Sequence, residues 1–316
     1  MDIREMDFGK NISSLLCDKD NAVLQMKDST GEGVMTVHQV FPGVMVVYND
    51  FHMETCFSLF DPQYEMLCID HCREGRIEWE LDGGSCLYVE TGDMYIGNRA
   101  GHVRRFGFPL CHYHGVSVGF VVQEAAAYFS QNMPGFPADF EALQQKFRLA
   151  EEPFLVRSSP AVSHLFADLY SVPEALRLHC LRVQVLRVLL HINTLEEAPQ
   201  NPAYRYFYKS QVNRVKQIMQ FITRNCTTHY TLEELSQRFA IPLTSMKECF
   251  KGVYGTSIYD YVRSYRMNSA ALRLRQTDET VAEVAAHFGY ENASKFAAAF
   301  KKVIGATPTS YRHLSV

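Results

Sequence analysis

Two histidines separated by a single residue, His112 and His114, lie in the stretch PLCHYHGVSVGFVV. Alternate side chains of a strand share a face, so both should point with Val116 and Phe120 into an apolar interior. An H-x-H pair on one strand face can supply two imidazole ligands to a metal ion. No Asp or Glu follows in GVSVGFVV, and His102 on the preceding loop is a conceivable third ligand that does not complete a convincing set.

Three interpretations of these histidines stay open: metal ligands of an enzyme, polar groups of a ligand pocket, and core residues. A pocket for a small molecule needs apolar walls with a few placed polar groups. Trp79, His112 and His114 are therefore the candidate ligand-binding residues, and we predict no metal or other cofactor. The nine cysteines contain no C-x-x-C pair, which favours a reduced, cytoplasmic setting.

Residues 34–122 have the pattern of short strands. The runs VMTVHQVF and VMVVYNDF are separated by Pro42-Gly43, and RIEWELDGGSCLYVE alternates apolar and charged residues before a turn at Asp82-Gly83-Gly84. Many short strands with turns between them predict a sandwich or a small barrel. The pattern changes to helices after Gln123.

A long helix is predicted from about Pro173, because proline suits a first helical turn. Apolar residues in this helix follow 3-4-3-4-3 spacing and form a seam: Leu178, Leu181, Val185, Val188, Ile192 and Leu195. The seam can pack on its own domain or pair with a second copy of the chain, in which case these residues are the dimer interface. Pro199 and Pro202 then break the helix and predict an interdomain linker.

Charge is divided unevenly along the chain. From Tyr208 to the end there are 15 Lys+Arg and 8 Asp+Glu, a net charge of +7, whereas the preceding residues carry 16 and 27, a net charge of -11. A basic segment on an acidic body is expected when one domain binds a polyanion. The stretch MDIREMDFGK has no apolar run, and no segment has the length of a membrane span, so no membrane association is predicted.

The basic segment contains an internal repeat. TLEELSQRFAI begins at Thr231 and TVAEVAAHFGY at Thr280, and each opens with the Thr-x-x-Glu capping box that starts a helix. After a short break, AIPL or GYEN, a second helix follows in which Met246 matches Phe296. The offset is 49 before the break and 50 after it, so the second turn is one residue longer.

Helix, tight turn and helix, twice over in a basic segment, is the layout of paired helix-turn-helix units. The sequence between them, SIYDYVRSYRMNSAALRLRQ, predicts a rigid connecting helix. Such a connector holds two reading helices about one DNA turn apart, roughly 34 Å, so that they enter successive major grooves.

These motifs resemble the DNA-binding domain of AraC/XylS-type transcription regulators. The resemblance runs through both units and the connecting helix, and TVAEVAAHFGYENASKFAAAFKKVIGATPTSYR carries its most diagnostic pattern. A looser resemblance, resting on GDMYIGNRAGH, links the strand region to the cupin-like sensor barrel of the family. The family implies a dimeric, sequence-specific regulator, more often an activator, with an effector of unknown identity in the barrel. It also implies contact with RNA polymerase and no enzymatic activity.

The resemblance further implies which residues meet double-stranded DNA. The first reading helix would present Thr244, Ser245, Lys247, Glu248 and Lys251. The second would present Asn292, Ser294, Lys295, Lys301 and Lys302.

The two reading helices should differ in what they read. Lys247 can donate to guanine and Glu248 can accept from cytosine N4, although an arginine is common in the family at the position of Glu248. Ala297 and Ala298 stand where polar readers are often found, so the second helix should mainly position the protein on phosphates. For each lysine, a solvated helix face is the alternative.

The predicted fold class is α+β: a cupin-like β-barrel with trailing helices, followed by an all-α domain of two helix-turn-helix units joined by a connecting helix. The predicted domains are a ligand-sensing domain at 1–172, a dimerisation helix and linker at 173–207, and a DNA-binding domain at 208–316. The units span 231–254 and 280–303. A DNA-architectural protein without a ligand is a second alternative, disfavoured because DNA bending does not need so large an acidic first domain.

Overall fold

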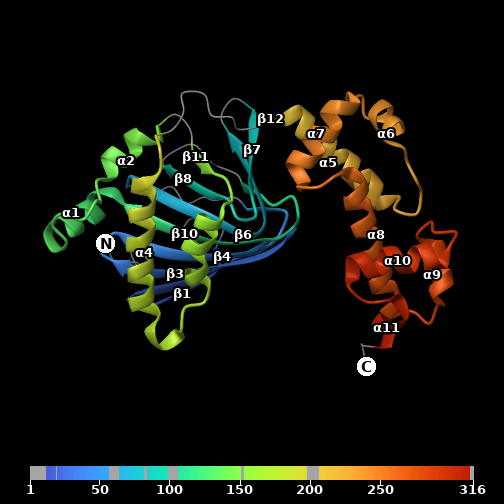
Figure 1. Ribbon diagram of the computed structural model, residues 1–316, viewed down its shortest axis with the longest axis horizontal. Coiled ribbons are helices and arrows are strands. Elements are labelled where there is room, and N and C mark those ends of the chain that lie inside the picture. The colour runs from blue at the N-terminus through green and yellow to red at the C-terminus, as the bar shows by residue number, and fades with distance from the viewer. Residues whose placement is uncertain are drawn as a thin grey trace. The chain divides into compact units, whose positions relative to one another are not determined.

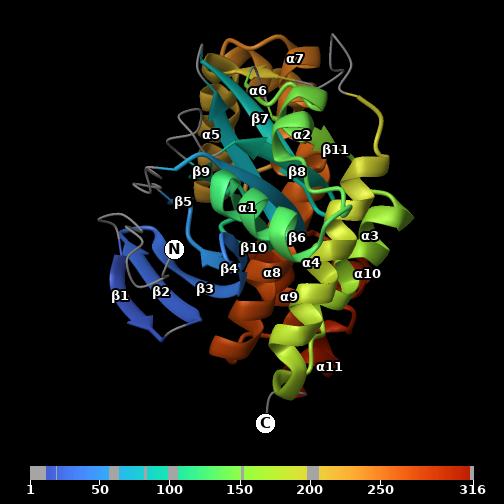
Figure 2. The same ribbon diagram turned by 90° about the vertical axis from the view of Figure 1, so that its left-hand side faces the viewer.

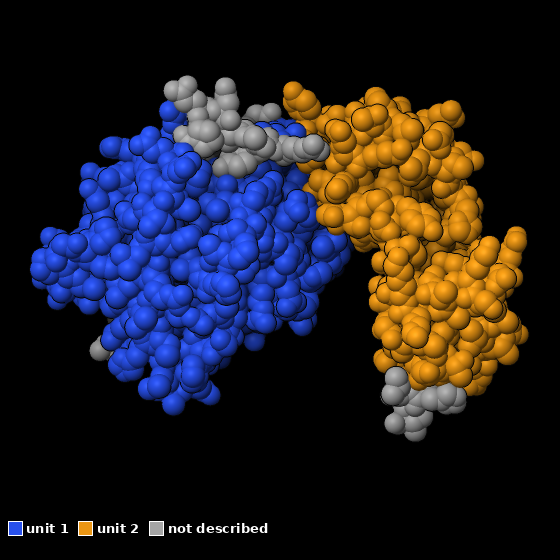
Figure 3. All heavy atoms as spheres, viewed as in Figure 1, with its two compact units in different colours: residues 1–206 blue, residues 207–316 orange. Residues whose placement is uncertain are grey.

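The computed structural model describes residues 12–18, 20–56, 64–81, 84–98, 106–150, 153–197 and 206–313. The chain divides into two compact units, residues 1–206 and 207–316 (Figure 3). The N-terminal stretch, the turn at Asp82-Gly83, His102 and the linker prolines Pro199 and Pro202 lie outside the described residues. None of the helices in the described ranges has an apolar stretch that would reach across a lipid bilayer.

Unit 1 is built on an antiparallel sheet. Its strands are β1 (Ile12–Cys17), β2 (Asn21–Asp28), β3 (Gly31–Phe41), β4 (Val44–His52), β5 (Thr55–Cys56), β6 (Met66–Leu81), β7 (Ser85–Glu90), β8 (Met94–Asn98), β9 (Phe106–Gly107), β10 (Tyr113–Val121) and β11 (Phe154–Val156). The order along the sheet is β1-β2-β3-β4-β10-β6-β7, while β8 pairs with β6 and β11, and β9 pairs with β5 and β6. The sheet starts earlier than predicted, because β1 and β2 precede residue 34.

Helices cover one face of this sheet (Figures 1 and 2). They are α1 (Val122–Asn132), α2 (Phe140–Lys146), α3 (Pro160–Ala167), the short 3-10 turns η2 (Asp168–Tyr170) and η3 (Glu174–Leu176), and α4 (Arg177–Thr194). The main hydrophobic core lies between them and the sheet, where Val116 and Phe120 of β10 join Phe166 of α3 and Val185 of α4. Burial of these side chains holds the helices on the sheet.

The apolar seam of α4 faces this core. Leu181, Val185, Val188 and Ile192 have no exposed surface, and Leu178 and Leu195 pack against the same cluster. The seam therefore packs on its own domain, which is one of the two alternatives that the spacing allowed. On the opposite side of the helix, Val183 and Leu190 are 56% and 47% exposed, and Leu176, the last residue of η3 just before the helix, is 56% exposed.

Unit 2 is helical. It contains the short strand β12 (Phe207–Tyr208) and the helices α5 (Lys209–Arg224), α6 (Leu232–Arg238), α7 (Leu243–Tyr254), α8 (Ile258–Gln276), α9 (Val281–His287), α10 (Ala293–Ile304) and α11 (Pro308–His313). The connecting helix is confirmed as α8, whose N-cap is Ser257. With an antiparallel sheet domain followed by a helical domain, the α+β fold class is confirmed.

Candidate nucleic-acid interface

Both predicted capping boxes are present in unit 2. The backbone N–H of Thr231 donates to Glu234 Oε2 at 2.8 Å, and the N–H of Glu234 donates to Thr231 Oγ1 at 3.1 Å. At the second unit, Thr280 and Glu283 make the same pair of bonds at 2.7 and 3.2 Å. These hydrogen bonds at Thr280 lower the pKa of Glu283. Each first helix therefore starts at the residue where the sequence places its cap.

The tight turns after α6 and α9 share one hydrogen-bond pattern. The N–H of Ile241 donates to the carbonyl of Ser236 at 3.1 Å, and the N–H of Tyr290 donates to that of Ala285 at 2.9 Å. Each bond closes the end of a helix as in a Schellman motif, and the residue before the donor takes positive φ. The second helices begin at Leu243 and Ala293, an offset of 50, which confirms the longer second turn.

Helix α7 divides into a buried and an exposed face. Met246, Cys249, Phe250 and Val253 are buried in unit 2. The predicted reading residues lie on the other face: Thr244, Lys247, Glu248 and Lys251 are exposed, and Ser245 is half-buried. Glu248 makes no ion pair with Lys247 or with another described residue. The carboxylate is therefore available to a partner outside the chain.

Helix α10 has the same division. Phe296 and Phe300 have no exposed surface. The predicted DNA-contacting residues are all exposed: Asn292, Ser294, Lys295, Lys301 and Lys302. Asn292 is the N-cap, and its Oδ1 accepts from the N–H groups of Ser294 and Lys295 at 2.8 and 3.1 Å. The amide oxygen thus has a structural role, because it satisfies two N–H groups in the first turn of the helix.

Arginines and lysines of unit 2 differ in whether they have partners within the chain. Arg266 donates to the carbonyls of Cys226 and Thr228 at 2.6 and 2.8 Å, and Arg273 makes a two-bond contact with Glu279 at 2.6 and 2.7 Å. That contact lowers the pKa of Glu279. The lysines of the reading helices, by contrast, make no ion pair with another described residue: Lys247, Lys251, Lys295, Lys301 and Lys302. These lysines of α7 and α10 therefore contribute to the net positive charge of unit 2.

Of the ligand-binding residues predicted for unit 1, His112 and His114 lie with their ring centroids 6.5 Å apart, whereas Trp79 belongs to a buried cluster that includes neither histidine. Trp79 is buried in a cluster that includes Phe51 and Tyr113. His114 follows Tyr113 in the strand and so lies on the opposite face of β10, where its side chain is 33% exposed. His112 precedes the strand, and its Nδ1 lies 3.0 Å from the carbonyl oxygen of Leu110.

The expectation that both histidines face an apolar interior is thus wrong. His114 does share its face with Val116 and Phe120, but the core that buries those two residues does not include it. Strand parity predicts the face of a residue and not how far along the strand that face is covered.

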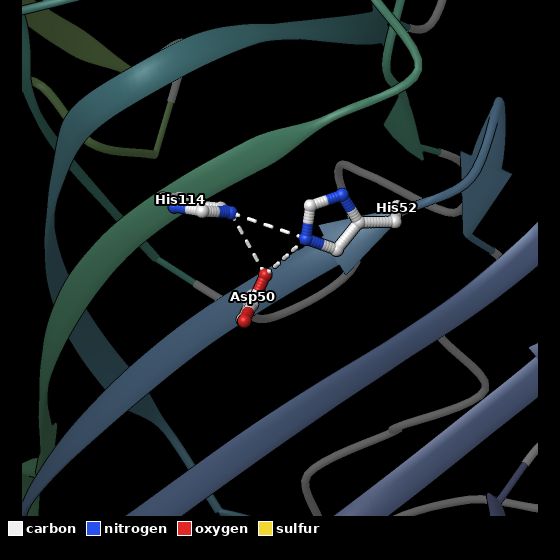
Figure 4. Close-up of side chains that lie close together, drawn as sticks. All are labelled: Asp50, His52 and His114. Atoms are coloured by element: carbon white, nitrogen blue, oxygen red, sulfur yellow. Dashed lines mark hydrogen bonds and ion pairs between the residues drawn. The ribbon is translucent and has the colours of Figure 1, made fainter. Parts of the chain in front are cut away.

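Two residues beside His114 are not among those predicted from the sequence. Asp50 and His52, on β4, lie with their side-chain atoms close to His114 Nε2 (Figure 4). The signal was the Asp-x-His spacing in VMVVYNDFH, which has the same two-residue period as His112 and His114.

Two helix-turn-helix units with exposed reading faces on a basic helical domain define a DNA-binding protein of the helix-turn-helix class. Residues 235–313 match a family described as a helix-turn-helix domain. The regulator ExsA of Pseudomonas aeruginosa is 25% identical over 240 residues, 73% of this chain and 78% of that protein. The transcriptional activator RhaR of Mannheimia succiniciproducens is 23% identical over 266 residues, 83% of this chain and 89% of that protein.

A third relative, the melibiose operon regulatory protein of Escherichia coli, is 26% identical over 113 residues, 34% of this chain and 37% of that protein. These matches confirm the resemblance of the C-terminal domain to the DNA-binding domain of AraC/XylS-type transcription regulators, and the relatives that align with most of the chain are themselves transcription regulators.

Proposed function

We propose that this protein is a transcription activator that binds DNA sequence-specifically through α7 and α10 and is controlled by a small molecule bound to unit 1. The observation that carries the DNA part is the pair of exposed helix faces whose lysines have no acidic partner among the described residues. Free lysines on a helix that follows a tight turn suit phosphate and base contacts in a major groove.

In this proposal the two helices have different roles in DNA binding. Helix α7 chooses bases, because Thr244, Lys247 and Glu248 are polar and exposed at its first turns. Helix α10 positions the domain, because its exposed groups are cations and a capped N-terminus, with Ala298 in place of a polar reader. Phosphate contacts fix register on the duplex, and base contacts carry the sequence information.

The test begins with selection of bound sequences from a random DNA pool, followed by affinity measurements as a function of salt. We expect the logarithm of the association constant to fall linearly with the logarithm of salt concentration, because bound lysines release counterions. Lys295→Ala and Lys301→Ala should weaken binding to all sequences and reduce the slope by about 1 each. Lys247→Ala and Glu248→Gln should instead relax the choice at one base pair, by about 1–3 kcal/mol of discrimination.

The matched control is Lys27→Ala, which removes an exposed lysine of unit 1 and should change neither slope nor sequence preference. Affinity that does not respond to salt contradicts the DNA assignment. Equal effects of Lys247→Ala and Lys295→Ala on every sequence contradict the division between the helices.

Control by an effector is supported by buried polar groups in unit 1. Asn49 Nδ2 donates to Ser117 Oγ at 3.0 Å, and the Ser117 hydroxyl donates to Asp70, so that side chains of β4, β10 and β6 are linked in the interior of the sheet. Trp79 is buried in a neighbouring apolar cluster. Apolar walls with a few placed polar groups are the usual composition of a small-molecule site.

The remaining parts of the proposal follow from the family. RhaR is named as an activator, and we propose the same role here, in the cytoplasm, through contact with RNA polymerase at the regulated promoter. We also propose that the protein acts as a homodimer, with unit 1 a cupin-like sensor, and that it is not an enzyme.

A further inference from the structure

Three potential metal ligands converge at one point on the surface of unit 1. Asp50 Oδ1 lies 2.9 Å from His52 Nε2 and 2.8 Å from His114 Nε2. The two imidazole nitrogens lie 3.3 Å from each other. All three atoms therefore form a small triangle, which Figure 4 shows with both rings directed at the carboxylate.

The strand pairing positions these residues before any metal binds. His114 of β10 is the direct partner of Asp50 in β4, and Asp50 and His52 share a face of β4 because alternate residues do. On the other face, Phe51 stacks on Tyr113 and on Phe108, with ring centroids 6.3 and 5.1 Å apart. The backbone that carries the triangle is thus anchored by a buried aromatic cluster, which is the support that a preorganised site needs.

Without a cation, the close approach of the two Nε2 atoms to each other and to the carboxylate oxygen is unfavourable. A neutral imidazole nitrogen either donates a proton or offers a lone pair. If both Nε2 atoms donate to Asp50, two N–H groups meet at one oxygen and face each other across 3.3 Å. A divalent cation instead accepts lone pairs from all three atoms, so their convergence becomes favourable.

The spacing fits a first-row transition metal. Ligand atoms bound at 2.0–2.1 Å to a tetrahedral zinc ion are about 3.3 Å apart, and those on adjacent positions of an octahedron are about 3.0 Å apart. The observed separations of 2.8, 2.9 and 3.3 Å need only a small outward movement of the carboxylate. Two imidazoles with one carboxylate favour zinc, nickel, copper or iron over calcium or magnesium.

The surroundings also suit a cation. Glu74 Oε2 lies 3.9 Å from His114 Nδ1, on the side of the ring away from the triangle. A carboxylate in that place favours the tautomer that leaves Nε2 as the ligand atom. Asp50 and His52 are 57% and 59% exposed, so positions on the metal would stay open to water or to an added ligand.

We propose that Asp50, His52 and His114 form a binding site for one divalent transition-metal ion of the zinc class. The site lies wholly in unit 1 and does not depend on the DNA-binding proposal. Because β4 and β10 also carry Asn49 and Ser117 of the buried polar chain, a bound ion would stiffen the strands that carry the proposed effector groups.

The experiment uses the full chain, freed of metal with a chelator and then titrated with Zn²⁺ in competition with a chromogenic chelator. We expect one equivalent to bind at this site, and His52→Gln, His114→Gln and Asp50→Asn each to weaken that binding at least tenfold. Glu74→Gln should weaken it less, because it acts through His114. His179→Gln, which alters an exposed histidine of α4, is the control and should bind zinc as the unaltered protein does.

Two further readouts separate loss of the site from loss of the fold and from binding at thiols. Zinc should raise the unfolding temperature of the unaltered protein and not of the His114→Gln variant, whose circular dichroism should be unchanged. Cys111→Ser removes an exposed thiol next to His112 and should leave zinc binding intact. The proposal is overturned if the unaltered protein binds no zinc, if the triangle variants bind it equally well, or if Cys111→Ser alone abolishes binding.

Discussion

Burial decides the chemistry of His71, a residue of β6 that packs under the helices of unit 1. Its ring stacks on Phe166 with centroids 4.4 Å apart and planes 7° from parallel, and its Nδ1 lies 2.9 Å from Tyr170 Oη. Removal from water disfavours the charged imidazolium and lowers the pKa of His71 to about 4. The ring is therefore neutral in the folded protein at neutral pH.

This burial predicts a pH dependence of stability. The folded pKa of His71 is about 4 and the unfolded value is about 6.5, so between these values the unfolded chain binds a proton that the folded chain does not. The free energy of unfolding should fall as pH is lowered, by about 2 kcal/mol between pH 7 and pH 5 from this residue alone. Urea unfolding followed by the fluorescence of Trp79, the single tryptophan of the chain, measures it in unit 1.

The variant that isolates the effect is His71→Phe. It keeps the stack on Phe166, and Tyr170 can still donate to the backbone oxygen of residue 71, a bond of 3.3 Å. We expect its unfolding free energy to change less between pH 7 and pH 5 than that of the unaltered protein, by about 2 kcal/mol. His191→Gln alters another histidine whose pKa is lowered by burial. This variant tests whether the reduced pH dependence of the unfolding free energy is specific to His71. An identical pH dependence in His71→Phe would contradict the prediction.

At the scale of elements, the two helix-turn-helix turns differ at one position. Gly289 takes φ 77° after α9, and Ala240 takes φ 48° at the matching position after α6. Positive φ costs an alanine roughly 1–2 kcal/mol, because its Cβ approaches the neighbouring carbonyl. A Cβ at Gly289 would also lie 2.9 Å from the backbone oxygen of Thr227. The second turn is therefore less tolerant of a side chain than the first.

Gly289→Ala should destabilise unit 2 by about 1–2 kcal/mol from backbone strain, with an additional loss from the contact with Thr227. Gly305→Ala is the matched control, because Gly305 has φ 86° but nothing within 4 Å of an added Cβ. The difference between the two variants measures the steric part. Urea unfolding followed by far-ultraviolet circular dichroism reports on these helices, and equal losses in the two variants would show that the contact has no cost.

At the scale of the whole molecule, a homodimer of this chain would need a surface other than the seam of α4. The seam of α4 is buried in unit 1, while Val183 and Leu190 lie seven residues apart on the other side of the helix and are exposed. Apolar residues seven apart stay on one side of a helix. A second copy of the chain, packed against the same stripe, would bury them symmetrically.

Val183→Glu and Leu190→Glu should therefore shift the protein from dimer to monomer in sedimentation equilibrium, because each places a charge in an apolar contact. Leu272→Glu alters a leucine of α8 that is 58% exposed and serves as the control. A dimer that survives both α4 changes excludes this stripe as the interface. A monomer at all concentrations in the unaltered protein excludes the homodimer itself.

Local signals made unit 2 predictable. The capping boxes at Thr231 and Thr280, the turns that follow α6 and α9, and the αL glycines at Gly255 and Gly305 all depend on residues within about one helical turn of each other. Phe296 and Phe300 are four residues apart, a spacing typical of the buried face of a helix, and both are buried. The structure of the stretch GYENASKFAAAFKK, a turn followed by a helix, was therefore predictable without tertiary contacts. The DNA groups that its lysines would contact were not predictable in this way.

The sequence by itself therefore determined the α+β class and the repeated helix-turn-helix with its buried and exposed helix faces, because short-range hydrogen bonds and periodicity specify them. Only the tertiary structure decided where the seam of α4 packs and that His114 meets Asp50 and His52, residues 62 and more positions away. Strand parity and helix periodicity show which residues share a face. They do not show which element covers it, since that depends on strand register and packing across the whole sheet.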